Sequence, residues 1–223
     1  MTQQQSLNKV RVWDLPTRAF HWLLAAAALG SFVSVKIGGN AMIWHGRFGY
    51  AVLTLLIFRV IWGLVGPVHA RFSQFLKGPA AILAELKGQN KISVGHNPLG
   101  ALSVVALILL FASQSLLGLL TSDDIFYDGP MVKYVSSTTV ELAGWAHRNA
   151  EWFLVGMVAL HVLAVIVHRV VKKHDLIGPM FTGDQAIPAE MAVQPSRDDM
   201  QTRLTALLIL ALSAGAVAVI AYA

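Results

Sequence analysis

The sequence contains no cysteine among its 223 residues. This absence excludes disulfide bonds, zinc sites with thiolate ligands and iron–sulfur clusters ligated by cysteine. It also excludes the C-x-x-C-H attachment that binds c-type haem covalently. Any cofactor of this chain must therefore be held without covalent bonds to cysteine sulfur.

Charged side chains are also scarce. Only 13% of the residues are charged, whereas 56% are hydrophobic and the mean hydropathy is +0.61. Soluble domains have about 25% charged residues, so this composition indicates that lipid surrounds most of the chain. A bilayer core of about 30 Å needs about 20 apolar residues per helix, and this chain can supply four or five such spans. We therefore expect an all-α integral membrane protein with one helical domain.

Five segments have the length and apolar character of membrane spans. They cover residues 19–36, 47–68, 98–121, 147–169 and 204–223. Only the second carries a full charge well inside it, at Arg59. The apolar stretch after the polar, basic start of the chain lacks a small-residue cleavage site. We therefore interpret it as a retained span rather than a signal peptide.

The distribution of positive charge predicts the orientation of these spans. Twelve Lys and Arg residues, Lys91 among them, lie on one side of the predicted spans, and four lie on the other. The positive-inside rule then places the N-terminus in the cytoplasm and the acidic loop 122–145 on the outer side of the membrane. The net charge of +5 is thus explained by membrane topology, and we do not expect nucleic acid as a partner.

Histidines are the most informative residues, because ionisable side chains at membrane depth are costly and indicate function. Of the eight histidines, His147 and His161 lie fourteen residues apart in the fourth predicted span. This spacing is just under four helical turns, or about 21 Å of rise, so both side chains share one helix face. The separation allows one porphyrin in each leaflet of the bilayer.

A histidine from another span is available at each of these depths. The first span begins at the cytoplasmic side, which places His21 level with His161, and the second begins outside, which places His45 level with His147. We therefore predict two pairs of axial ligands to haem iron. Neutral imidazole suits this role because it offers a nitrogen lone pair without a net charge. Two imidazoles per iron leave no open position, which favours electron transfer over oxygen chemistry.

Alternatives remain open for these residues. His168 follows His161 by seven residues on the same face and is the rival for the inner ligand. Arg59 follows His45 by fourteen residues and could pair with a propionate of the inner haem, or it could extend toward the cytoplasm. His45 and His147 could also be ordinary hydrogen-bonding residues between helices.

Other polar residues near these pairs have simpler interpretations. Gln114 is expected to hydrogen-bond between helices, with a quinone contact as the weaker alternative, and Glu151 to reach the outer interface rather than orient His147. Gly49, one turn after His45, would leave space for a flat macrocycle. Three histidines in predicted connections are expected to be solvated, although the first two could serve a quinone or a propionate: His69, His96 and His174.

Several motifs occur in a recognisable order. They are Val10–Arg18 (VRVWDLPTR) followed by Phe20-His21-Trp22, then His45-Gly46-Arg47, then His96-Asn97-Pro98-Leu99-Gly100, and finally the pair His147 and His161. Over residues 9–182 the chain thus resembles the bacterial cytochrome b561 family, which includes the b-type cytochrome subunits of nickel–iron hydrogenases.

The resemblance implies a four-helix transmembrane bundle with two non-covalent haems b and a quinone as the membrane partner. It carries the ligand roles over to His21, His45, His147 and His161. Family members receive electrons from a hydrogenase, serve periplasmic c-type cytochromes, or, as stand-alone relatives, oxidise superoxide and reduce ubiquinone. Residues 183–203, an expected cytoplasmic linker, and the fifth span over 204–223 lie outside the four-helix pattern.

Three functions remain in competition. The first is an electron-transfer subunit between the quinone pool and a periplasmic redox partner, either a hydrogenase or a c-type cytochrome. The alternative is a stand-alone superoxide:quinone oxidoreductase, in which Lys36, Arg47 and Arg148 would steer the anion. A metal or proton transporter is disfavoured, because no Asp or Glu lies in the interior of a predicted span. The small residues of 204–223 suit packing against a partner or within an oligomer.

Overall fold

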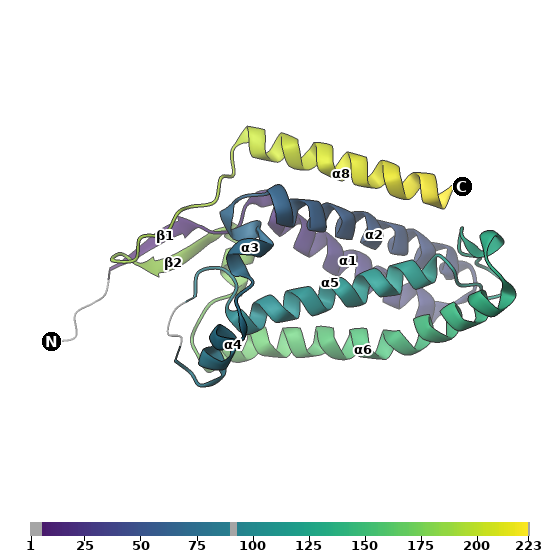
Figure 1. The fold of residues 1–223 in the computed structure, drawn as a ribbon, viewed down its shortest axis with the longest axis horizontal. Coiled ribbons are helices and arrows are strands. Elements are labelled where there is room, and N and C mark those ends of the chain that lie inside the picture. The colour runs from purple at the N-terminus through teal and green to yellow at the C-terminus, as the bar shows by residue number, and fades with distance from the viewer. Residues whose placement is uncertain (1–5, 90–92, 223) are drawn as a thin grey trace.

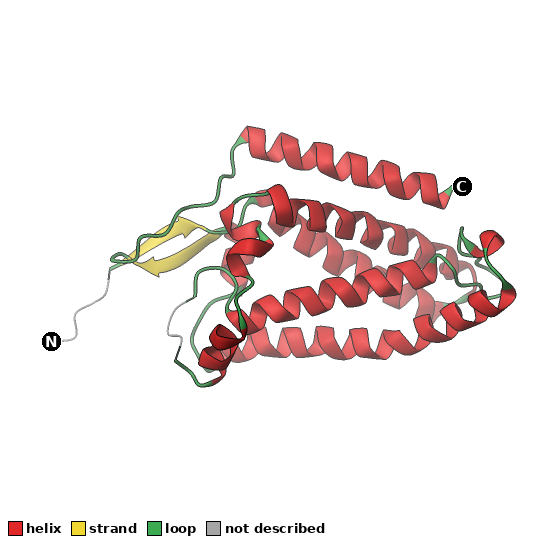
Figure 2. Cartoon of the chain, in the orientation of Figure 1, coloured by secondary structure: helices red, strands yellow, loops and turns green. Residues whose placement is uncertain are grey.

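A computed structural model describes residues 6–89 and 93–222. Lys91, which belongs to the charge count, and Ala223, the end of the fifth predicted span, lie outside these ranges. Within them, five helices are long and apolar enough to cross a membrane, which confirms the multi-pass membrane class. They run side by side in Figures 1 and 2: α1 (Leu15–Ile37), α2 (Met42–Val65), α5 (Pro98–Gly118), α6 (Ser137–Val170) and α8 (Met200–Ala221).

Shorter elements close the two ends of this bundle. The helical ones are η1 (Gly39–Ala41), η2 (Val68–Ala70), α3 (Phe72–Phe75), α4 (Pro79–Leu86), η3 (Val132–Tyr134) and α7 (Ile177–Thr182). Strands β1 (Leu7–Arg11) and β2 (Asp184–Pro188) pair antiparallel, with Leu7 opposite Pro188 and Arg11 opposite Asp184. We call the end with these strands the sheet end, and the end with residues 119–136 the loop end (Figure 1).

Four of the five spanning helices are longer than the apolar segments that predict them, and α5 is three residues shorter. The largest difference is in α6, which begins at Ser137 rather than at residue 147. Its first turn is stabilised by the N-cap Ser136, whose hydroxyl accepts a hydrogen bond from the Thr139 backbone at 3.2 Å. A hydropathy window detects only the apolar part of such a helix, so the polar first turns were not predicted.

The start of α1 is fixed by the buried side chain of Asp14. As the N-cap it accepts hydrogen bonds from the Thr17 backbone (2.9 Å) and the Thr17 hydroxyl (2.8 Å). The indole Nε1 of Trp62 in α2 donates to the same carboxyl group at 3.1 Å. Burial raises the pKa of Asp14, which these hydrogen bonds oppose. Asp14 therefore sets both the start of α1 and its position against α2.

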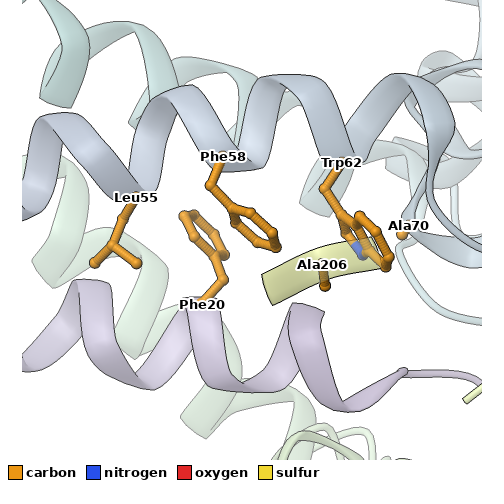
Figure 3. Close-up of a cluster of buried hydrophobic side chains, with 6 residues drawn as sticks. All are labelled: Phe20, Leu55, Phe58, Trp62, Ala70 and Ala206. Carbon is orange, nitrogen blue, oxygen red and sulfur yellow. The ribbon is translucent and has the colours of Figure 1, made fainter. Parts of the chain in front are cut away.

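Helix α2 is the centre of the bundle. It packs against α1, α5 and α8. Helix α6 packs against α5 and has few close contacts with α1 or α2. Part of the core lies between α1, α2 and α8 and consists of apolar side chains (Figure 3): Phe20, Leu55, Phe58, Trp62, Ala70 and Ala206. The fifth helix therefore covers one face of α2, while α6 faces α1 and α2 from a greater distance.

The segment 183–203, which the sequence predicts as a cytoplasmic linker, contains defined structure. It contains β2, and its Asp198 carboxylate contacts Arg11 (2.5 Å), Arg203 (3.2 Å) and Arg18 (3.7 Å). Burial opposes ionisation, but hydrogen bonds, chiefly from Arg203, hold the pKa of Asp198 below its usual value. This ion-pair cluster connects the start of α8 to β1 and α1.

Candidate functional site

The four predicted ligand histidines lie in two pairs. The imidazole centroids of His45 in α2 and His147 in α6 are 6.0 Å apart, with an angle of 88° between the rings. Those of His21 in α1 and His161 in α6 are 6.5 Å apart, at 51°. The first pair lies toward the loop end and the second toward the sheet end, about 21 Å apart along α6.

These distances can be compared with two imidazoles on one metal ion. A metal–nitrogen bond of about 2.0–2.1 Å on each side, with each ring centre about 1.1 Å behind its nitrogen, gives a centroid separation of about 6.3 Å. Both pairs are within a few tenths of an ångström of this value. Neutral imidazoles are also suitable donors for iron, so the residues present fit two bis-histidine haem groups. Their assignment as ligands stays a prediction.

Hydrogen bonds orient both rings of the loop-end pair. His45 Nδ1 lies 3.0 Å from both the carbonyl and the hydroxyl oxygen of Ser31, and it donates to the carbonyl in the tautomer that leaves Nε2 unprotonated. His147 Nδ1 donates to the backbone carbonyl of Gln114 at 3.0 Å in the same tautomer. The side-chain amide of Gln114 donates in turn to the His147 carbonyl at 2.9 Å, as predicted for an interhelical hydrogen bond. With Nδ1 engaged, Nε2 carries the lone pair that a metal requires.

Glycines shape the surroundings of this pair. A Cβ atom added at Gly49, one turn after His45, would meet no atom of the described residues within 4 Å. By contrast, a Cβ at Gly118 would lie only 3.2 Å from Cε1 of His147, so glycine allows α5 to approach that ring. The free space beside Gly49 agrees with the space expected there for a macrocycle.

The carboxylate of Glu151 does not orient His147 by a hydrogen bond. Its oxygen accepts from Lys36 Nζ of α1 at 2.6 Å. The pair joins α1 and α6 near the loop end. It also means that Lys36 is not an isolated positive charge.

The sheet-end pair has different surroundings. His21 Nδ1 is buried and has no hydrogen-bond partner among the described residues. Nearby, Arg59 is only 2% exposed and donates to the Ala70 carbonyl at 3.2 Å. Its guanidinium lies over three phenylalanine rings, with centroids at 4.8 Å (Phe72), 5.9 Å (Phe20) and 6.0 Å (Phe75).

Arg59 therefore points toward the sheet end but is enclosed rather than solvated. Among the described residues no carboxylate lies within ion-pair distance of it. Asp14 interacts with Arg59 electrostatically from beyond that distance, and its carboxylate is occupied by hydrogen bonds from Thr17 and Trp62. A buried guanidinium without a directly paired anion is energetically costly, so this position favours a further negatively charged ligand.

His168 is engaged elsewhere. Its Nδ1 donates to the Ala164 carbonyl at 2.9 Å, and its Nε2 lies 3.3 Å from both Asn97 Nδ2 and Lys172 Nζ. The histidine that lies beside His21 is His161.

His96 was expected to be solvated, and this expectation is wrong. Its ring lies 4.7 Å from Trp13 and 4.6 Å from Phe75, and its Nδ1 is buried without a partner among the described residues. Burial and, to a lesser extent, the neighbouring Arg59 and the sheet-end histidines lower the pKa of His96 to about 3. Its place in the motif His96-Asn97-Pro98-Leu99-Gly100, just before α5, was the available signal.

The other two connecting histidines differ from His96. His174 is exposed, as predicted. His69 is half-buried, and its Nε2 lies 2.9 Å from the Gln194 carbonyl oxygen.

Comparison with known proteins bears on the whole arrangement. The family model described as prokaryotic cytochrome b561 matches residues 12–183. A protein of Rhizobium leguminosarum bv. viciae is 24% identical over 219 residues, covering 80% of this chain and 89% of its own length. One from Azotobacter vinelandii is 25% identical over 215 residues, covering 78% and 87%. Both are named "Probable Ni/Fe-hydrogenase B-type cytochrome subunit".

A protein of the same name from Cupriavidus necator is 22% identical over 220 residues, covering 80% of this chain and 88% of its own length. No solved structure matches the chain significantly. The family match covers most of the chain, including all four helices that carry or contact the histidine pairs, and leaves β1, β2 and α8 outside. The chain therefore belongs to the prokaryotic cytochrome b561 family, as a multi-pass b-type cytochrome of electron transport.

Proposed function

We propose that this cytochrome holds two haems b, one between His45 and His147 and one between His21 and His161, and carries electrons across a bacterial inner membrane. The N-terminus and the sheet end would face the cytoplasm, and the loop end would face the periplasm. The observation that supports this most strongly is the separation of the imidazole centroids, 6.0 and 6.5 Å. A haem b bound at each pair supplies a reversible one-electron centre.

The remaining residues of the site have definable tasks. Ser31 and Gln114 fix the rings of the loop-end pair through backbone carbonyls. Gly49 keeps α2 free of side-chain bulk beside His45. Arg59 offers a buried positive charge near the sheet-end pair, where it would hold a propionate.

The partners we propose are a membrane quinone and a redox protein on the periplasmic side. The quinone follows from the family resemblance. The named relatives are hydrogenase cytochrome subunits, which supports a hydrogenase partner, with a c-type cytochrome as the other candidate. The chain would then act as the electron-transfer subunit of a respiratory complex rather than as an enzyme by itself.

The superoxide:quinone oxidoreductase is the less favoured function. It depends on a positive field around the loop-end pair from Lys36, Arg47 and Arg148. Lys36 is neutralised by Glu151 at 2.6 Å, and Arg148 lines a hollow that also contains Glu141. The field that would attract an anion is correspondingly weaker.

The proposed function can be tested on the purified chain. Pyridine haemochrome analysis should give about two haems b per chain, because each imidazole pair binds one. The chain is then placed in liposomes that enclose a membrane-impermeant electron acceptor, and quinol is added to the outer solution. The chain should carry electrons from the quinol to the enclosed acceptor. A haem content near zero, or no transfer by a haem-loaded chain, would overturn the proposal.

A further inference from the structure

The loop end carries a projecting segment that the ligand pairs do not require. Helix α6 has 34 residues, whereas the other spanning helices have 21 to 24. At 1.5 Å per residue it is about 51 Å long, well beyond a bilayer core of about 30 Å. Its first turns and the preceding loop project past the end of α5 (Figure 1).

Large apolar side chains are exposed on this projection. They are Ile125 (78% exposed), Leu142 (65%), Trp145 (60%), Tyr134 (58%) and Phe126 (48%). An open hollow beside them is lined in part by Val132, Val135, Val140 and Gly144. A cluster of exposed apolar residues around a hollow is typical of a protein interaction site.

The rim of this hollow is mainly acidic. Asp124, Asp128 and Glu141 line it and are exposed, whereas Arg148 is the basic residue of the lining. The sheet end has the opposite character, because most Lys and Arg residues of the chain lie there. Charge complementarity therefore favours a basic partner at the loop end.

The loop that carries these groups has a defined shape. The Asp123 carboxylate accepts hydrogen bonds from the backbone N–H groups of Ile125 (3.1 Å), Phe126 (2.7 Å) and Tyr127 (2.8 Å). Burial opposes its ionisation, but these hydrogen bonds together hold the pKa of Asp123 below its usual value. The exposed side chains are thus presented by a preorganised turn, which reduces the entropy lost on binding.

This surface also adjoins the loop-end histidines. The Tyr127 ring packs against Gly46, the residue after His45, and its hydroxyl lies 3.2 Å from that of Tyr50. Arg148 in the hollow directly follows His147. A protein bound here would lie next to both residues of that pair.

We propose that the loop-end surface, formed by residues 122–128, 132–135 and 140–148, is the docking site for a soluble redox protein with a basic, partly apolar face. That the partner is a redox protein rests on the proposed function. A lipid surface fits less well, because acidic side chains are repelled by anionic headgroups.

Binding tests this directly and does not need a haem-loaded chain. The full chain is placed in nanodiscs of zwitterionic lipid, and calorimetry measures the binding of a basic soluble c-type cytochrome. The matched probe is the same cytochrome with succinylated lysines, which reverses its charge. We expect the native probe to bind, with affinity at least about tenfold weaker in high salt, and the succinylated probe and empty nanodiscs to show no binding.

A double variant and a control variant test whether the basic probe binds at the loop-end surface. Asp124→Asn with Glu141→Gln should weaken binding about three- to tenfold, because exposed rim charges are removed while Asp128, which accepts from Ser122, and the Asp123 turn remain. Glu190→Gln removes one acidic charge outside this surface and should leave binding unchanged. Leu142→Ala should weaken binding without changing its salt dependence.

Three results would overturn the proposal: equal binding of the two probes, binding independent of salt, or an undiminished affinity of the Asp124/Glu141 variant. Because these readouts do not use haem, they are separate from failure of the proposed function. A chain that binds the basic probe but contains no haem would refute the electron-transfer role and still support the docking surface.

Discussion

The two histidine pairs share α6 but differ in what surrounds them. At the loop end, each ring donates its Nδ1 hydrogen to a backbone carbonyl of a neighbouring helix, Ser31 or Gln114. At the sheet end, His21 Nδ1 has no partner among the described residues, and the buried cation Arg59 lies nearby. One pair is thus oriented by hydrogen bonds, whereas the other lies near a buried positive charge.

This difference predicts different reduction potentials. A hydrogen bond from Nδ1 to a carbonyl makes the imidazole more basic, which stabilises oxidised iron and lowers the potential. A nearby positive charge stabilises the reduced form and raises it. We therefore expect a haem at the sheet end to have the higher potential of the two.

The largest effect on this comparison is expected from Gly49→Leu. The added side chain would extend into the space beside His45, where an added Cβ meets no atom of the described residues within 4 Å, so the bundle should fold while the loop-end haem is excluded. The haem content should fall from about two per chain to about one, with the sheet-end component retained.

Gly156→Leu is the matched control. Gly156 lies on α6, is exposed, and also has no atom of the described residues within 4 Å of an added Cβ. Both haems should remain in this variant. Loss of haem in both variants would show that the space beside Gly49 has no special role.

Removing the buried charge at the sheet end should have the next largest effect. Arg59→Gln should lower the potential of the sheet-end haem by at least about 59 mV, a tenfold change in its redox ratio, and leave the loop-end haem unchanged. Arg59→Lys keeps the charge and should recover most of the shift. Potentiometric titration of both variants checks this, and equal shifts at both haems would contradict it.

A smaller effect concerns how the sheet end is held together. Asp198→Asn removes the carboxylate shared by Arg11 and Arg203, and should reduce stability by about 1.5 kcal/mol, since the arginines are partly exposed. The folded-state pKa of Asp198 is lowered, so its contribution is present above its unfolded pKa, near 3.9, and is lost as pH falls through the folded value.

Hydrogen exchange across residues 184–203 provides the measurement. After correction for the intrinsic rates, exchange in the wild type should accelerate as the pH falls below about 4. This acceleration should be smaller in Asp198→Asn. Glu141→Gln, which removes an exposed carboxylate at the loop end, should behave as the wild type. Identical acid responses in Asp198→Asn and the wild type would contradict this role of Asp198.

The smallest effect is expected from Gln114→Leu at the loop end. It removes the hydrogen bond to the His147 carbonyl, which should cost about 0.6 kcal/mol, as is typical between membrane helices. The backbone bond from His147 Nδ1 to residue 114 remains, so haem content should not change. Ser113→Ala, which affects a bond within α5 alone, is the control in thermal unfolding. A greater loss of thermal stability in Ser113→Ala than in Gln114→Leu would refute the interhelical role of Gln114.

The sequence predicted the spanning helices and the pairs of neighbouring histidines because both follow from local rules. Apolar length identifies a span, and a fourteen-residue spacing places His147 and His161 on one face. Once the direction of each span is known, the depths of His21 and His45 follow. These inferences need no knowledge of how side chains pack.

The features that were missed depend on contacts between distant segments. Strand β1 pairs with β2 across most of the chain, with Leu7 opposite Pro188, and strands of five residues give little signal in a helical sequence. The His96 ring is enclosed in part by Trp13 and Phe75, which come from distant segments. The role of Asp198 likewise depends on arginines from both ends of the chain.

The pairing itself is tested most directly by four single variants: His21→Ala, His45→Ala, His147→Ala and His161→Ala. Potentiometric and spectroscopic titration should show that the variants of His45 and His147 lose the same low-potential component. Those of His21 and His161 should lose the other, and His168→Ala should retain both. The account would be contradicted if two variants from different pairs lost the same component. It would also be contradicted if His168→Ala lost a haem.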